Sequence, residues 1–269
     1  MKTLAIRDSS LSGFVNMAVD VCSMKLVRSG FAGAVFRTYQ WAPYCLSIGR
    51  FQKPHREADV KRLLEDGYHM VRRPTGGRAV WHGHELTYSI VAVEDHPLVR
   101  GSIAESLEKV AGILTEGLRN SGVPAVLNSR SRELYSSGRE FNPCFTSHGR
   151  SEIMTKDGRK LVGSAQARSH GVFIEHGSII FTNQQTKAVD YLPEAASSSF
   201  RKRMRELLLK GVGAVLEYNP DITPEILAEN LHEQFALQTG GTPASYLSAD
   251  LPGLKEEIDE RRQIIEDYH

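Results

Sequence analysis

The stretch that decides the fold is a glycine-containing turn with arginines on either side. It reads Arg72-Arg73-Pro74-Thr75-Gly76-Gly77-Arg78-Ala79-Val80-Trp81-His82 and continues after two residues as Glu85-Leu86-Thr87-Tyr88-Ser89. Adjacent glycines can adopt positive φ and let a ligand approach the backbone closely, and arginine offers a planar cationic group. We therefore interpret the turn as a cradle for an anionic ligand, with binding residues Arg72, Arg73, Thr75, Gly76 and Gly77. A surface hairpin with exposed arginines is the alternative that the local sequence leaves open.

Two histidines follow the turn. In a continuous strand, side chains alternate between faces, which would place His82 and His84 on one face and Trp81 and Glu85 on the other. Two histidines could begin a metal site, but no third or fourth ligand stands at a recognisable spacing. We predict no metal and interpret His82 as a hydrogen-bonding group that lines the cradle. A structural histidine is the alternative.

A lysine stands just past a second tight turn. Asp157-Gly158 is typical of a hairpin turn, and Lys160 follows it before the small residues Gly163, Ser164 and Ala165. Small side chains suit a backbone that lies against a ligand, so we predict that these three residues bind substrate. Lys160 could stabilise an oxyanion, hold a phosphate or act as a base, and a solvated strand lysine is the alternative. Further along, Gly211-Val212-Gly213 lacks the third glycine of a dinucleotide-binding motif.

The chain has three cysteines, Cys22, Cys45 and Cys144, and none forms a C-x-x-C pair. The odd number argues against a disulfide framework. The local patterns predict that Cys22 packs in a helix and Cys45 in a strand. Cys144 follows Pro143 in an irregular segment where a thiol can reach a substrate. A reactive cysteine needs a lowered pKa, which a nearby cation could supply. An inert loop cysteine is the alternative.

Size and composition favour an ordinary globular protein. The 269 residues carry a net charge of +1, which gives no overall attraction to nucleic acid or membrane. No apolar run approaches about 18 residues, and no leader peptide is recognisable, so we expect a cytoplasmic protein. We predict a single domain over residues 1–269, completed by C-terminal helices from about 194.

Helical and strand patterns alternate irregularly, which predicts the α+β class. Apolar periodicity predicts helices over residues 13–29, 57–65, 102–120, 201–215, 224–237 and 254–268. The runs typical of strands are 34–39, 45–48, 70–72, 86–93, 153–154, 160–165, 172–174 and 178–181.

The motifs together resemble the biotin/lipoate protein ligase family. The run from Arg72 to Ser89 is similar to that family's signature. The segment Gly158-Arg159-Lys160-Leu161-Val162-Gly163-Ser164-Ala165-Gln166, followed by His176-Gly177-Ser178-Ile179-Ile180, resembles its lysine segment and next strand. Asn16-Met17-Ala18-Val19-Asp20 resembles its first helix. The resemblance spans about residues 13 to 182 and implies mixed β-sheets flanked by helices, the class II synthetase-like catalytic domain.

Within that family, the sequence looks most like the cysteine-dependent octanoyltransferases of Gram-positive type. The resemblance implies catalytic Cys144 and Lys160, octanoyl-acyl carrier protein as donor, and no cofactor. It implies a lipoyl domain as acceptor, in glycine cleavage H protein or in a 2-oxoacid dehydrogenase E2. Because acyl carrier protein is acidic, Arg72, Arg73 and Arg78 would be steering charges.

Three other functions stay open. An ATP-dependent lipoate-protein ligase would use ATP and Mg to form lipoyl-AMP, and Gly149-Arg150-Ser151-Glu152-Ile153 partly resembles a ligase run that has an asparagine and an aspartate. An octanoyl amidotransferase would move octanoate between lipoyl domains. A non-catalytic module would only bind its partner.

Overall fold

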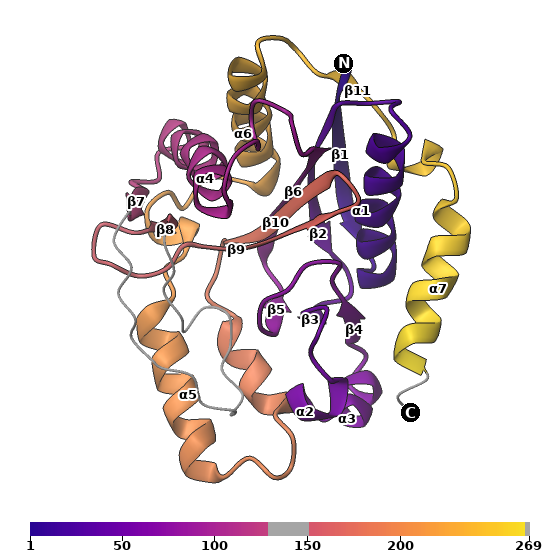
Figure 1. Ribbon diagram of the computed structural model, residues 1–269. Coiled ribbons are helices and arrows are strands. Elements are labelled where there is room, and N and C mark those ends of the chain that lie inside the picture. The colour runs from indigo at the N-terminus through magenta and orange to yellow at the C-terminus, as the bar shows by residue number, and fades with distance from the viewer. Residues whose placement is uncertain (129–150, 267–269) are drawn as a thin grey trace.

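A six-stranded mixed sheet forms the centre of the molecule. The computed structural model describes residues 1–128 and 151–266 (Figure 1). The strand order is β11-β1-β2-β6-β10-β9. β1 pairs in parallel with β2 and with β11, whereas the β2–β6, β6–β10 and β10–β9 pairs are antiparallel. The bounds are β1 Thr3–Leu11, β2 Ala34–Trp41, β6 Glu85–Val93, β9 Val162–Ser169, β10 Val172–Ile180 and β11 Ala244–Ser245. This mixed sheet flanked by helices confirms the predicted α+β class.

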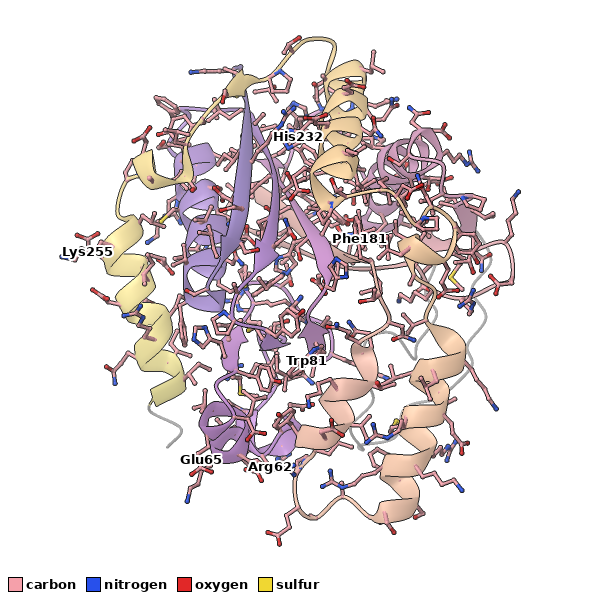
Figure 2. All side chains as sticks on the ribbon, turned by 180° about the vertical axis from the view of Figure 1, so that it is seen from behind. Arg62, Glu65, Trp81, Phe181, His232 and Lys255 are labelled. Carbon is pink, nitrogen blue, oxygen red and sulfur yellow. The ribbon has the colours of Figure 1, made fainter. Side chains whose placement is uncertain are left out.

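Helices cover both faces of the sheet. On one face lies α1 (Gly13–Arg28), with α7 (Leu254–Glu266) packed against its outer side, and on the other face lie α4 (Ile103–Asn120) and α6 (Pro224–Thr239) (Figure 1). The α4/α6 face encloses the larger apolar core. Seen from behind in Figure 2, His232 of α6 lies against this face, with Nε2 3.1 Å from Thr38 Oγ1. None of the described helices is long and apolar enough to cross a bilayer.

A second, three-stranded sheet carries the glycine-containing turn. Its order is β4-β3-β5, with β3 Cys45–Ile48, β4 His69–Arg72 and β5 Val80–His82. The short helices α2 (Pro54–Glu57) and α3 (Val60–Glu65) lie between β3 and β4 in the chain. The turn over residues 73–79 therefore links two strands of this sheet. A two-stranded ribbon joins β7 (Val126–Asn128) to β8 (Glu152–Met154), and α5 (Ser198–Gly211) lies between β10 and α6 in the chain.

Most predicted helices are confirmed, including the capping box of Ser102 and Glu105 at the start of α4. The predicted helix 57–65 is confirmed over Val60–Glu65 as α3, but it starts later than expected, because Glu57 ends the short helix α2 and Asp59 caps α3. The two predicted strands 172–174 and 178–181 are one strand, β10, since β6 and β9 pair with its polar middle on both sides. The sequence patterns did not predict β1, whose second half is mostly polar.

Candidate functional site

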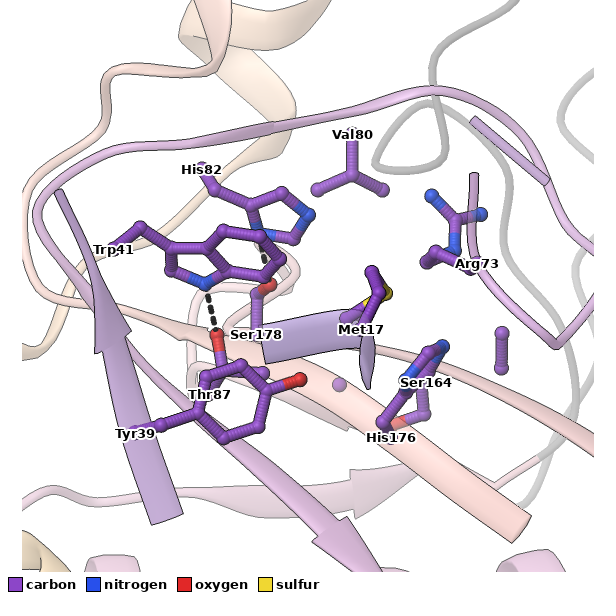
Figure 3. Close-up of a pocket in the computed structure, with 13 residues that line it drawn as sticks. Met17, Tyr39, Trp41, Arg73, Val80, His82, Thr87, Ser164, His176 and Ser178 are labelled. Carbon is purple, nitrogen blue, oxygen red and sulfur yellow. Dashed lines mark hydrogen bonds between the residues drawn. The ribbon is translucent and has the colours of Figure 1, made fainter. Parts of the chain in front are cut away.

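A pocket opens where the two sheets meet (Figure 3). It draws its walls from the main sheet, from α1 and from both ends of the glycine-containing turn. The lining residues are Met17, Tyr39, Trp41, Arg73, Val80, His82, Thr87, Gly163, Ser164, Ala165, His176, Gly177 and Ser178. The structure thus brings together Arg73, His82, Gly163, Ser164 and Ala165, all predicted from the sequence to bind substrate.

One wall is fixed by a buried hydrogen-bonded series of a carboxylate, an imidazole and a hydroxyl group. His82 Nδ1 lies 2.7 Å from Glu85 Oε1, and His82 Nε2 lies 2.5 Å from Ser47 Oγ. Ser178 and Thr87 also donate to the same Glu85 oxygen, at 2.7 and 2.8 Å. Because Glu85 bonds Nδ1 and Ser47 bonds Nε2, the imidazole has both nitrogens engaged and is held at a fixed angle.

This arrangement corrects the predicted faces of the histidine segment. β5 ends at His82 and β6 begins at Glu85, so the chain bends at Gly83 and His84 and does not run as one strand. His82 and Glu85 consequently contact each other, whereas His84 lies 3.3 Å from Thr182. The predicted pairing of His82 and His84 on one face is therefore wrong. In the described part of the chain, no three His, Cys, Asp or Glu side chains gather as metal ligands would.

A second buried series of the same type ends on the turn itself. Asp20 Oδ2 accepts a hydrogen bond from His176 Nδ1 at 3.0 Å, and His176 Nε2 lies 2.7 Å from Thr75 Oγ1. Burial lowers the pKa of His176, so the ring is neutral and its bare Nε2 accepts the Thr75 proton. Burial alone would raise the pKa of Asp20, but the hydrogen bond from His176 and the charge of Arg37 lower it. The Asp20 carboxylate is therefore charged, with Arg37 Nη1 at 3.0 Å.

The two arginines before the turn hold backbone. Arg73 is buried and donates to the carbonyl oxygens of Ser47, Gly76 and Arg78 at 2.9, 3.1 and 2.8 Å. Arg72 Nη1 donates to three carbonyl oxygens between residues 49 and 52. These bonds shape the turn and the loop beside it. A ligand role for Arg72 and Arg73 stays a prediction.

The glycines of the turn allow a close approach between segments. Gly77 has φ of +90°, and a Cβ on Gly49 would overlap the Gly77 carbonyl oxygen. A Cβ on Gly77 would stand 3.6 Å from the Cβ of Ala165, which lines the pocket. The turn therefore lies directly against β9, and its role as a cradle for an anion stays a prediction. Thr75 reaches the site through His176, and Gly76 through its bond to Arg73.

Lys160 lies two residues before β9 and outside the pocket lining. Its side chain is only 5% exposed, and Nζ is 2.7 Å from Glu152 Oε1. The backbone is fixed as well, because Lys160 N donates to Gly211 O and Gly213 N donates to Lys160 O, at 2.7 and 3.0 Å. Gly211 and Gly213 thus have a structural role beside the lysine. Lys160 is therefore a buried ion-pair partner, and the alternative of a solvated strand lysine is wrong.

Two of the three cysteines are unsuited to catalysis. Cys22 in α1 and Cys45 in β3 are buried free thiols, as the sequence predicted. Burial raises the pKa of Cys22 to about 11 and that of Cys45 well above its usual value, so neither is a thiolate at neutral pH. Cys144 lies outside the described residues.

Sequence reasoning missed a buried carboxyl group behind the pocket. Glu175 of β10 is 1% exposed and lies 2.9 Å from Tyr88 Oη, which is 2.8 Å from Ser164 Oγ. The other oxygen of Glu175 has no hydrogen-bond partner among the described residues. Burial raises the pKa of Glu175 to about 8. The sequence patterns also did not predict that Asp20 and Arg37 are buried partners. For Asp20 a signal was present, because it is a charged residue within the apolar stripe of a helix.

Glu175→Gln should stabilise the protein at alkaline pH. The folded chain retains this proton up to about pH 8, whereas the unfolded chain releases it near 4.5. The contribution of protonated Glu175 to the free energy of unfolding is thus fully present below pH 4.5 and is lost as the pH rises through 8. We expect the variant to exceed wild type by roughly 1–3 kcal/mol in urea unfolding at pH 9, with little difference at pH 4. Equal gains at both pH values, or a gain matched by exposed Glu206→Gln, would contradict this account.

Comparison with known families identifies the fold and its relatives. The model of the lipoyl protein ligase A/B catalytic domain matches residues 12–236. The chain belongs to this family. The resemblance seen in the sequence motifs is therefore confirmed, and the pocket lies within the matched catalytic domain.

Relatives within the lipoyl protein ligase A/B family carry a more specific name. Octanoyltransferase LipM of Moorella thermoacetica is 42% identical over 185 residues, which cover 67% of this chain and 66% of that protein. Octanoyltransferase LipM of Clostridioides difficile is 33% identical over 257 residues, which cover 94% of this chain and 92% of that protein. The structure of a bipartite lipoate protein ligase with its E2 lipoyl domain, from Thermoplasma acidophilum, superposes with a TM-score of 0.74 at 18% identity, covering 99% and 92%. That likeness shows the shared fold.

Proposed function

We propose that the protein is an acyltransferase that moves an octanoyl group onto a lysine of a lipoyl domain. The observation that carries this proposal is the relationship to proteins named octanoyltransferase LipM, which in Clostridioides difficile extends over 94% of this chain. The pocket supports it, since Met17, Trp41, Val80 and Ala165 give apolar wall beside fixed polar groups, the composition that an acyl chain with a reactive carbonyl needs. No cofactor is required by this proposal.

The proposed reaction proceeds through a thioester on Cys144. The Cys144 thiolate attacks the octanoyl carbonyl carbon of acyl carrier protein, the donor C–S bond breaks, and the carrier leaves as a thiol after taking up a proton. The amine of the acceptor lysine then attacks the new thioester. An amide forms, the C–S bond to Cys144 breaks, and the amine proton returns the cysteine to its thiol state. The high pKa of Cys22 and Cys45 supports Cys144 as the nucleophile.

Lys160 would stabilise the oxyanion that develops in both steps. Its ammonium group has its position fixed by Glu152 and by backbone bonds to Gly211 and Gly213. A preorganised cation costs no reorganisation when charge develops. In the sequence, Glu152 stands eight residues after Cys144.

The need for ATP separates the transferase from the ligase. We expect purified protein to octanoylate a lipoyl domain from octanoyl-acyl carrier protein without ATP or Mg, and to leave the domain unmodified when given octanoate, ATP and Mg. Intact-mass measurement of the lipoyl domain reports both reactions. Modification that requires ATP would refute the transferase. An octanoylated lipoyl domain used as donor tests the amidotransferase alternative in the same assay.

A further inference from the structure

The segment of residues 49–56, termed here the Phe51 loop, runs from the end of β3 into α2 and presents an aromatic ring and cations to solvent. Phe51 is 87% exposed, the highest exposure of any large apolar side chain after Met1 in the described chain. Arg50, Lys53 and Arg56 are also exposed, and residues 50–56 contain no aspartate or glutamate. The Arg50 guanidinium lies 5.7 Å from the centre of the Phe51 ring. Exposed aromatic residues and arginines are enriched at the centre of protein interfaces.

The Phe51 loop is a fixed platform. Arg72 Nη1 donates to the carbonyl oxygens of Gly49, Arg50 and Gln52 at 3.3, 2.9 and 2.6 Å. Gly49 N donates to Gln52 Oε1 at 2.9 Å, and Gln52 N donates to Gly49 O at 3.0 Å. The backbone on either side of Phe51 is therefore held in place before a partner arrives, which reduces the entropy cost of ordering it on binding.

The Phe51 loop is joined to the pocket by direct contacts. Arg50 N donates to Thr75 O at 2.8 Å, and Gly49 lies against the carbonyl of Gly77. Gly77 in turn lies against Ala165 in the pocket lining. A protein bound on the Phe51 loop would consequently stand beside the turn that borders the site. Arg72 and Arg73, expected from the sequence to steer the donor, also bind backbone carbonyls, and their steering role stays a prediction.

We propose that the Phe51 loop is the docking surface for the donor, a small acidic protein that carries the acyl thioester. This inference rests on the proposed transferase function. The three exposed cations complement an acidic partner in a chain whose net charge is only +1, and Phe51 supplies an apolar anchor among them. Complementary charge acts mainly on the rate of association. The acceptor domain is the other occupant that the test must separate from the donor.

The test compares a protein donor with a small one. Rates of octanoyl transfer to Cys144 are measured with octanoyl-acyl carrier protein and with octanoyl-coenzyme A for wild type, Arg50→Glu/Lys53→Glu and Phe51→Ala. A matched charge reversal, Arg28→Glu/Lys255→Glu, lies on α1 and α7; Figure 2 labels Lys255 well away from Arg62 and Glu65 of α3. The carrier-protein KM should rise at least 10-fold in the double loop variant and about 5-fold in Phe51→Ala, with rates from octanoyl-coenzyme A unchanged and the control pair normal.

Three outcomes would overturn the docking proposal. An unchanged carrier-protein KM excludes donor docking. An equal loss of transfer rate with both donors means that the loop affects the structure of the site and not the association with the carrier protein. A loss confined to the second step, measured by adding lipoyl domain to preformed acyl-enzyme, assigns the surface to the acceptor. If wild type forms no acyl-enzyme with either donor, the transferase proposal itself fails, and that result is distinct from these three.

Discussion

Lys160→Met should reduce octanoyl transfer by roughly 10³-fold, the loss expected when one preorganised oxyanion donor is removed. The lysine is buried, and its ammonium group lies 2.7 Å from Glu152. The substitution also leaves that carboxylate without its cation in a site that is only 12% exposed, so a lower melting temperature should accompany the loss of activity. Transfer is measured from octanoyl-acyl carrier protein to a lipoyl domain, and stability by thermal unfolding.

A double variant separates the two effects. Lys160→Met/Glu152→Gln replaces the ion pair with neutral groups, so the melting temperature should recover toward the wild-type value. The transfer rate should stay about 10³-fold low because the cation is still absent. Glu152→Gln alone keeps the lysine and should be far more active than either variant without it. A double variant with restored activity would show that Lys160 is only a structural partner of Glu152.

Asp20→Asn should cost about 3–5 kcal/mol of unfolding free energy, as removal of one partner from a buried ion pair does. The carboxylate is fully buried and accepts bonds from Arg37, Tyr39, Ser89 and His176. Asparagine has one oxygen in place of two and no charge, so Arg37 loses its fully buried counterion. Unfolding in urea at pH 7 measures the difference.

Asp8→Asn is the matched control, because Asp8 pairs with the same guanidinium, 2.7 Å from Arg37 Nε. Its side chain is 10% exposed, against 0% for Asp20, and water can replace part of the lost bond. We expect a cost of about 1 kcal/mol there. Equal costs for the two variants, or an Asp20→Asn protein as stable as wild type, would contradict the assignment of Asp20 as the buried anchor of His176 and Thr75.

The elements that the sequence predicted well are those with strong local signals. The capping box of Ser102 and Glu105 and the apolar stripe behind it predicted α4. The Asp157-Gly158 turn predicted Lys160 just past it, but the strand expected over residues 160–165 begins at Val162, so Lys160 lies before β9 and not in it. β1 escaped prediction because it is held by parallel pairing with β2, about 30 residues away in the chain. Local patterns do not report such distant partners.

The candidate site shows the same limit. The residue types around the glycine-containing turn indicated a pocket, and the structure brings five of the predicted residues to it. The partners of the two arginine side chains could not be predicted from the sequence, because Arg72 and Arg73 bind carbonyls contributed by β3 and the loop after it. His176 was visible as part of a motif, but its bonds to Asp20 and Thr75 join segments more than 100 residues apart.

The most direct test of the account is the intact mass of the protein after incubation with octanoyl-acyl carrier protein. We predict one octanoyl adduct on wild type that hydroxylamine removes, that lipoyl domain discharges, and that Cys144→Ser does not form. Cys22→Ser and Cys45→Ser should retain the adduct, because both thiols are buried with raised pKa values. Absence of an adduct on wild type, or an adduct that persists in Cys144→Ser, would contradict the thioester mechanism.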